Sequence, residues 1–70
     1  MKFNLCVIES VMNKYGMGRV ETFWKSFETK DEREQYLVVL KEKYDKVEFK
    51  REETNENINA MYVVADKVGK

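Results

Sequence analysis

The sequence offers few side chains that could take part in catalysis, and its single cysteine, Cys6, is the first to consider. A nucleophilic thiol needs a neighbouring base or a lowered pKa, and the chain contains no histidine that could act as the base. Ser10 and Ser26 lack a histidine partner for the same reason. We therefore expect Cys6 to be a small buried apolar residue and expect no nucleophilic catalysis.

Acidic side chains gather in two runs that would be the other candidates for chemistry. They are Asp31, Glu32 and Glu34, and then Glu52, Glu53 and Glu56. Both runs lie among lysines, and the first falls at the start of a predicted helix, whose positive end stabilises carboxylates. A zinc site is not expected with one thiol and no histidine. The segment Gly16-Met17-Gly18 is too short for a phosphate-binding loop. The sequence thus predicts no enzyme, no metal, no cofactor and no small-molecule substrate.

The length of 70 residues allows one domain, spanning residues 1–70. A chain of this size buries only about 60% of the surface that its unfolded form exposes, so marginal stability is expected. Small folds commonly gain stability from disulfides, a metal or oligomerisation. Because one cysteine cannot form a disulfide within the chain, oligomerisation is the expected source, with a homodimer favoured.

The charge balance excludes some partners, since 13 basic and 13 acidic residues cancel. No whole-protein field draws such a chain to nucleic acid or to anionic lipid. The first apolar run is interrupted by Glu9, unlike a signal peptide, and no stretch approaches the roughly 18 apolar residues of a membrane span. A cytoplasmic location is expected. Abundant Lys, Asn and Tyr with no Pro suits AT-rich codons, as in a low-GC bacterium or its phage.

The clearest local signal predicts a helix from about Thr29 to Tyr44. Thr29 and Glu32 have the spacing of a capping box, and Lys41 and Lys43 would lie in the last turn, where cations are stabilised. At 100° per residue, one face is apolar and Val38 points away from it. The residues of that face are Tyr36, Leu37, Leu40 and Tyr44, with Val39 at the border.

Apolar, aromatic and β-branched residues mark four segments as strands: residues 2–12, 19–27, 46–52 and 58–66. Residues 2–12 also fit a helix, capped by Asn4 and ended by Gly16. We expect an α+β fold of order β-β-α-β-β, a four-stranded antiparallel sheet with one helix on one face. The alternative order is α-β-α-β-β.

Three of the four predicted strands are apolar on both sides, although an exposed antiparallel sheet should alternate. One helix shields one face, so an apolar patch is expected on the other, where such patches mark interaction sites. The predicted interaction surface consists of Phe23, Trp24, Phe27, Met61 and Val63. Alternation leaves open whether Trp24 or the pair Phe23 and Phe27 faces the helix. A β-bulge, a helical N-terminus or the Met1 end could instead cover the patch.

These features predict a small non-catalytic module that binds another protein or a second copy of itself. A more specific form of this expectation is a phage or mobile-element accessory protein that binds and modulates a host protein. The alternative is a single-stranded nucleic-acid-binding protein, in which sheet aromatics stack on bases beside Lys14, Arg19 and Lys25. The neutral charge and the absence of a basic-Gly-aromatic-Gly/Ala-Phe motif argue against the alternative.

Overall fold

The computed structural model describes residues 1–12, 15 and 18–68, and it contains one sheet and one helix. The elements in chain order are β1 (Lys2–Met12), β2 (Gly18–Phe27), α1 (Lys30–Lys43), β3 (Lys46–Thr54) and β4 (Ile58–Val68). The predicted order β-β-α-β-β is therefore confirmed, and residues 2–12 form a strand rather than a helix. Gly16, the expected end of the alternative helix, lies outside the described residues.

The prediction of a purely antiparallel sheet is wrong, because the sheet is mixed. The strands lie in the order β2-β1-β4-β3. The outer pairs β1–β2 and β3–β4 are antiparallel, but the two central strands, β1 and β4, run parallel. The two hairpins therefore lie side by side, with the β1–β2 turn and the β3–β4 turn at opposite ends of the sheet.

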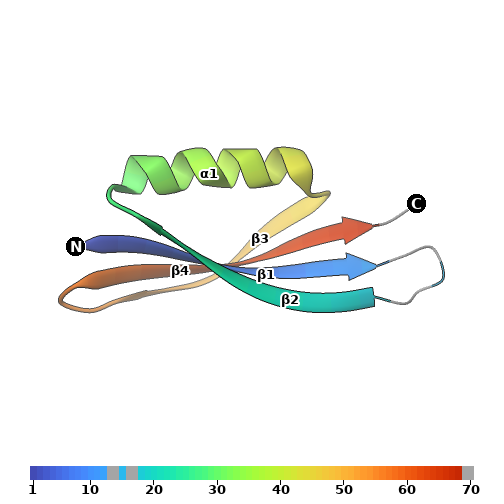
Figure 1. Ribbon diagram of the computed structural model, residues 1–70, viewed down its shortest axis with the longest axis horizontal. Coiled ribbons are helices and arrows are strands. Elements are labelled where there is room, and N and C mark those ends of the chain that lie inside the picture. Colours follow the sequence, from blue (N-terminus) through green and yellow to red (C-terminus); the bar gives the residue numbers. More distant parts are fainter. Residues whose placement is uncertain (13–14, 16–17, 69–70) are drawn as a thin grey trace.

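Helix α1 is the physical reason for the parallel centre. It runs back along the sheet from the end of β2 to the start of β3, so β3 begins at the end of the sheet where β2 began (Figure 1). β3 therefore runs in the same direction as β2, and β4, which returns antiparallel to β3, runs parallel to β1. The strands of a parallel pair are usually buried on both faces and lack alternation. This explains why β1 and β4 are apolar on both sides, whereas the edge strand β3 alternates over residues 46–49.

The start of α1 confirms the predicted cap. The hydroxyl of Thr29 accepts a hydrogen bond from the backbone N–H of Glu32 at 3.2 Å, and it donates one to the Glu32 carboxylate. Asp31 and Glu32 lie in the first turn, and Lys41 and Lys43 lie in the last. These charges complement the helix dipole at both ends.

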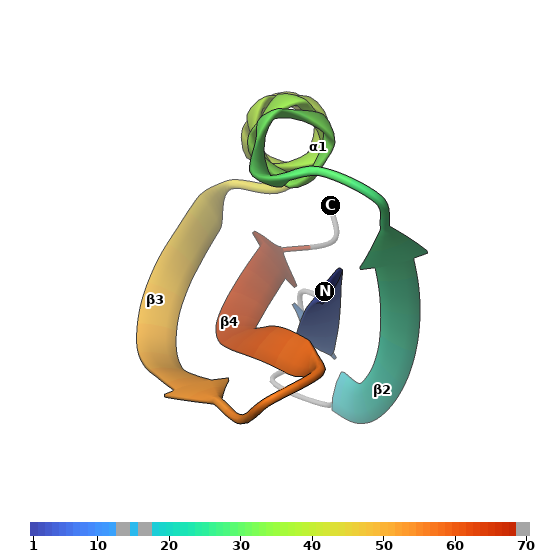
Figure 2. The same ribbon diagram turned by 90° about the vertical axis from the view of Figure 1, so that its left-hand side faces the viewer.

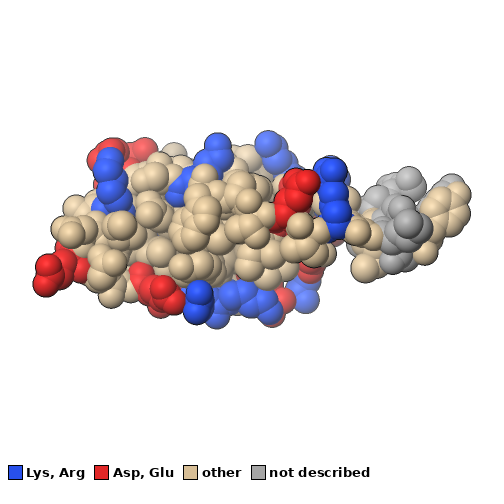
Figure 3. Space-filling view, turned by 60° about the horizontal axis from the view of Figure 1, so that its bottom comes forward, with Lys and Arg blue, Asp and Glu red and all other residues tan. Residues whose placement is uncertain are grey.

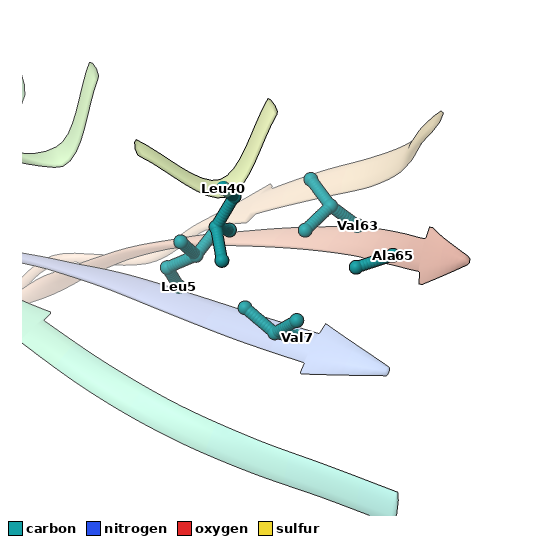
Figure 4. Packing of buried hydrophobic residues seen from close by; sticks show 5 residues of the cluster. All are labelled: Leu5, Val7, Leu40, Val63 and Ala65. Carbon is teal, nitrogen blue, oxygen red and sulfur yellow. The ribbon is translucent and has the colours of Figure 1, made fainter. Parts of the chain in front are cut away.

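The core lies between α1 and the central strands, and it consists of Leu5, Val7, Leu40, Val63 and Ala65 (Figure 4). The predicted apolar face of the helix is confirmed, since Tyr36, Leu37 and Tyr44 pack against this cluster beside Leu40. Val38 is exposed, as predicted. Seen along the strands, α1 lies above the sheet between its two outer strands (Figure 2).

The molecule is elongated, with extents of 44 × 19 × 15 Å and a radius of gyration of 13.1 Å. A compact domain of this length would have a radius near 11 Å. Strands of 11 residues span about 36 Å, whereas a 14-residue helix spans about 21 Å. Helix α1 therefore covers only part of one face. No helix in the described part of the chain is long and apolar enough to cross a membrane.

Candidate interaction surface

The side of the sheet that faces away from α1, here called the open face, is covered by no other element in the described structure. Uncharged side chains occupy the middle of this face, and charged ones gather mostly along its borders (Figure 3). Its apolar and aromatic members come from three strands: Val20, Trp24, Cys6, Ile8, Ala60, Tyr62 and Val64. A face with an apolar middle and a charged border has the distribution expected of a protein contact surface.

One row of side chains crosses all four strands at the middle of the open face. Trp24 on β2 is paired with Cys6 on β1, Cys6 is paired with Tyr62 on β4, and Tyr62 is paired with Arg51 on β3. We call Trp24, Cys6, Tyr62 and Arg51 the aromatic row. Paired residues on neighbouring strands point to the same face, so the sheet register brings these four together.

Contacts within the aromatic row hold its large side chains against each other. The rings of Trp24 and Tyr62 meet edge to face, with centroids 5.5 Å apart and planes at 81°. The guanidinium of Arg51 lies over the Tyr62 ring, 4.4 Å from its centroid. Both geometries are favourable for aromatic and cation–π contacts. The row is thus ordered before any partner binds, which lowers the entropy lost on binding.

Cys6 lies beneath the two rings and is only 3% exposed, as predicted for a small buried residue. Burial raises the pKa of the Cys6 thiol above its ordinary value, and the charge of Arg51 opposes this with a smaller effect. A raised pKa leaves little thiolate at neutral pH, and only the thiolate is nucleophilic. This thiol therefore has the properties of a packing residue.

Trp24 remains accessible despite these contacts, with 54% of its surface exposed. Val20, four residues earlier on the same side of β2, is also exposed. Large apolar side chains exposed on a pre-ordered face are the kind of residue that contributes most to protein–protein binding.

The cations of the open face are engaged by neighbouring carboxylates. Arg51 Nη1 lies 3.1 Å from Glu53. Lys46 and Lys50 lie 3.8 Å and 3.5 Å from the carboxylate of Glu48. The surface near the row is therefore close to neutral, and its cations already have anionic partners.

A shallow depression of about 330 Å³ adjoins the row toward the turn between β3 and β4. Its walls combine the rings of Trp24 and Tyr62 with polar side chains of the turn. The lining residues are Asn4, Trp24, Glu53, Thr54, Asn55, Ile58, Ala60 and Tyr62. Because Glu53 is already paired with Arg51, this mixed polar and aromatic lining suits an amphipathic side chain of a partner.

The five predicted surface residues lie on different sides of the sheet. Phe23 and Phe27 are half-buried on the helix side, where the Phe27 ring packs at a tilt against the Tyr36 ring, with centroids 5.6 Å apart. Trp24 alone among the five points to the open face. The sequence left open which of these residues faces the helix, and in the structure Trp24 is the one that faces away from it.

The expected outward placement of Met61 and Val63 is wrong. Val63 is 2% exposed and belongs to the core under α1, and Met61 packs against the same core. The outward residues of β4 are the alternate ones, including Tyr62. The sequence does not show which side of β4 faces outward, because both sides are apolar. Only the pairing with β1 orients the strand.

Met61 and Val63 do line a groove of about 240 Å³ on the helix side, between α1 and the edge strand β3. The other lining residues are Leu37, Lys41, Val47 and Phe49. Phe49 is exposed at the outer wall. This groove is apolar but narrow, and it has no aromatic pair comparable to Trp24 and Tyr62.

Sequence reasoning missed Tyr62 and Arg51 as members of the surface. Alternation groups Tyr62 with Ile58 and Ala60 along β4, but it could not assign this group to the open face, because both sides of β4 are apolar. Arg51 could not be assigned to it either, because the β3 register shifts between Phe49 and Arg51. A bulge of this kind moves the following side chains to the opposite face, and simple alternation does not predict it.

The other polar cluster in the structure surrounds the buried guanidinium of Arg33 on the helix side. Arg33 Nη1 donates to the Asn59 side-chain oxygen at 2.6 Å and to the backbone oxygens of Asn59 and Asn4 at 3.2 Å and 3.3 Å. Its Nη2 lies 3.5 Å from Glu52. The cluster joins α1 to both central strands, so we interpret it as structural.

Within the described ranges, no group of three or more Cys, Asp or Glu side chains is placed to hold a metal ion. Comparisons of the chain with protein-family models, with curated proteins and with solved structures gave no match.

Proposed function

We propose that this protein is a non-catalytic binding module that contacts another protein through the open face of its sheet. The observation that supports this most directly is the aromatic row, in which an exposed Trp24 is held against Tyr62 and Arg51. Trp, Tyr and Arg are the residue types most enriched at binding hot spots. Here all three meet at the centre of a face that no described element covers.

The charges around the row favour a protein partner over a nucleic acid. Affinity for nucleic acid depends mainly on cations that neutralise phosphates. Arg51 and the two lysines of β3 lie beside Glu53 and Glu48 instead. Arg19 and Lys25 do not accompany Trp24 either, because they alternate with it along β2, and Lys25 lies over the ring of Tyr36 on the helix side. Lys14 lies outside the described residues.

The experiment compares Trp24→Ser with the matched control Val38→Ser as baits for proteins from the cells that encode this chain. Both substitutions remove an apolar side chain that is about half exposed, 54% at Trp24 and 56% at Val38. Val38 lies on the outer side of α1, away from the sheet. Circular dichroism would first establish that both variants fold.

The expected result is a protein retained by the wild type and by Val38→Ser but lost with Trp24→Ser. Its affinity would then be measured with purified components, where loss of a hot-spot Trp should weaken binding by more than about tenfold. Equal retention by all three baits would show that the open face is not the contact surface.

A second candidate, binding of single-stranded nucleic acid, is favoured by one observation, the stacked Arg51 and Tyr62 beside Trp24. Bases stack on such side chains without sequence preference. Fluorescence anisotropy of a labelled single-stranded oligonucleotide, at low and high salt, tests it. Binding that weakens steeply with salt and is lost in Trp24→Ser would replace the protein-binding proposal, and no binding at low salt would exclude the candidate.

A further inference from the structure

The outer edge of β2 is a long run of backbone groups that pairs with nothing in the described structure. β2 lies at the end of the sheet order, and its pairing with β1 continues without a bulge from Phe3–Phe27 to Met12–Gly18. No other element lies beyond this strand (Figure 2). An exposed edge of ten residues is a template for another strand.

The opposite edge, β3, carries features that discourage such pairing. Six of its nine residues are charged, and a bulge interrupts the strand between Phe49 and Arg51. Charges and bulges are the common means by which edge strands avoid pairing with other chains. β2 has only three charged residues among its ten. The two edges therefore differ, and β2 is the one able to pair.

The charges of β2 match a second copy of β2 in one central register. A two-fold axis perpendicular to the sheet makes two such strands antiparallel and keeps their helix sides together. With Phe23 opposite Phe23 of the second copy, Glu21 of each chain lies opposite Lys25 of the other. If the two strands shift so that Thr22 lies opposite Thr22 of the second copy, Arg19 of each chain lies opposite Lys25 of the other. Two like charges then face each other in each pair.

Glu21 also lacks a favourable neighbour on its inner side. Its partner on β1 is Glu9, and like charges directly opposite are destabilising. Arg19 Nε is 3.9 Å from Glu21, at the limit of an ion pair between exposed side chains. Lys25 of a second copy would supply a cation on the outer side of Glu21.

We propose that two copies of this chain pair through β2, with Phe23 at the two-fold axis, to form one continuous eight-stranded sheet. The two helices then lie on one side, and the two open faces join on the other. Each Trp24 lies opposite Thr22 of the other copy, so the two Trp24 residues are diagonal neighbours near the axis. The paired strands would extend the aromatic row from Arg51 of one copy to Arg51 of the other.

The test measures the mass of the intact protein by sedimentation velocity over a wide concentration range. The wild type should change from 8.4 kDa to twice that mass as concentration rises. Lys25→Glu and Glu21→Lys should each raise the dissociation constant by about tenfold to a hundredfold, because two attractive pairs become repulsive. The double variant Glu21→Lys/Lys25→Glu should restore the dimer. Lys46→Glu, on the other edge, is the control and should leave the dimer unchanged.

A protein that stays monomeric at all concentrations, or a dimer that neither single charge reversal weakens, would overturn the proposal. Restoration by the double variant distinguishes β2 pairing from a dimer through the open face, where these two charges do not lie. The outcome of this dimer test does not depend on whether the proposed function is correct. A monomer that still loses its partner in Trp24→Ser refutes only the β2 dimer, and a dimer without such a loss refutes only the open-face contact.

Discussion

At the scale of single residues, this protein uses reactive side chains for packing. Cys6 could be a nucleophile by type, but its thiol is enclosed by Trp24 and Tyr62, and burial raises its pKa. Tyr44 is similar, because its hydroxyl donates a hydrogen bond to the Glu9 carboxylate and so joins the end of α1 to β1. Both groups are held by neighbouring side chains, and both report on the structure around them.

The enclosure of Cys6 predicts how fast its thiol reacts. Trp24→Ser should raise the rate of modification by a disulfide reagent at pH 8 by about tenfold, because the thiol becomes accessible and its burial no longer suppresses the thiolate. Val38→Ser should leave the rate unchanged. The rates would be followed by absorbance without denaturant. A wild-type rate equal to that of the unfolded protein would show that the rings do not enclose the thiol.

The Tyr44–Glu9 contact predicts a loss of stability at alkaline pH. The hydrogen bond to Glu9, followed by burial and by the Glu9 charge, raises the pKa of Tyr44 to about 12 from an ordinary value of 10.0. The unfolded chain therefore releases this proton first, so the contribution is complete below pH 10 and is lost as the pH rises toward 12.

Urea unfolding at a series of pH values from 8 to 12 would measure this effect. Tyr44→Phe should show a shallower fall in the free energy of unfolding above pH 10 than the wild type. Tyr15→Phe, which changes an exposed ring, is the control and should keep the wild-type slope. Identical slopes in all three proteins would contradict the assigned pKa.

At the scale of elements, α1 is fastened to the sheet by a charge as well as by its apolar face. Arg33 is 1% exposed, and its side chain lies over the ring of Phe3 while it donates to the two central strands. The sequence contains a signal for this position, since Arg33 lies four residues before Leu37 and seven before Leu40. At 100° per residue it shares their face. Sequence analysis missed it because arginine is rarely buried.

Replacing Arg33 should therefore be costly. Arg33→Met leaves the oxygens of Asn59 and Asn4 without their donor, and we expect a loss of about 3 kcal/mol in the free energy of unfolding. Glu52→Gln should cost less than about 1 kcal/mol, because the Glu52 side chain is 39% exposed and water can replace the contact. Urea unfolding would measure both, with Gln35→Met as an exposed helix control. An equal loss in all three variants would contradict this role.

At the scale of the whole molecule, two hairpins joined by a short helix produce a long sheet with one covered face. The helix is shorter than the strands, so the open face and the β2 edge remain accessible. The two surfaces are adjacent, since Trp24 belongs to both β2 and the aromatic row. A dimer through β2 would therefore enlarge the contact surface that we propose for a partner protein.

Local sequence patterns are sufficient to predict most elements of this protein. The cap at Thr29, the apolar face that contains Leu40 and the burial of Cys6 follow from local spacing and residue type, and the structure confirms them. These features depend on neighbours within a few residues, which the chain order supplies directly. The types of the other four elements follow in the same way, whereas residues 2–12 fit both a strand and a helix, and their pairing with β2 and β4 makes them a strand.

The tertiary structure alone decided which side chains lie outward. β1 and β4 are apolar on both sides, so alternation gives no orientation, and the parallel pairing between them places Val63 in the core and Tyr62 on the open face. The bulge in β3 then brings Arg51 beside Tyr62. Parallel pairing and register are contacts between residues far apart in the chain, and no local pattern specifies them.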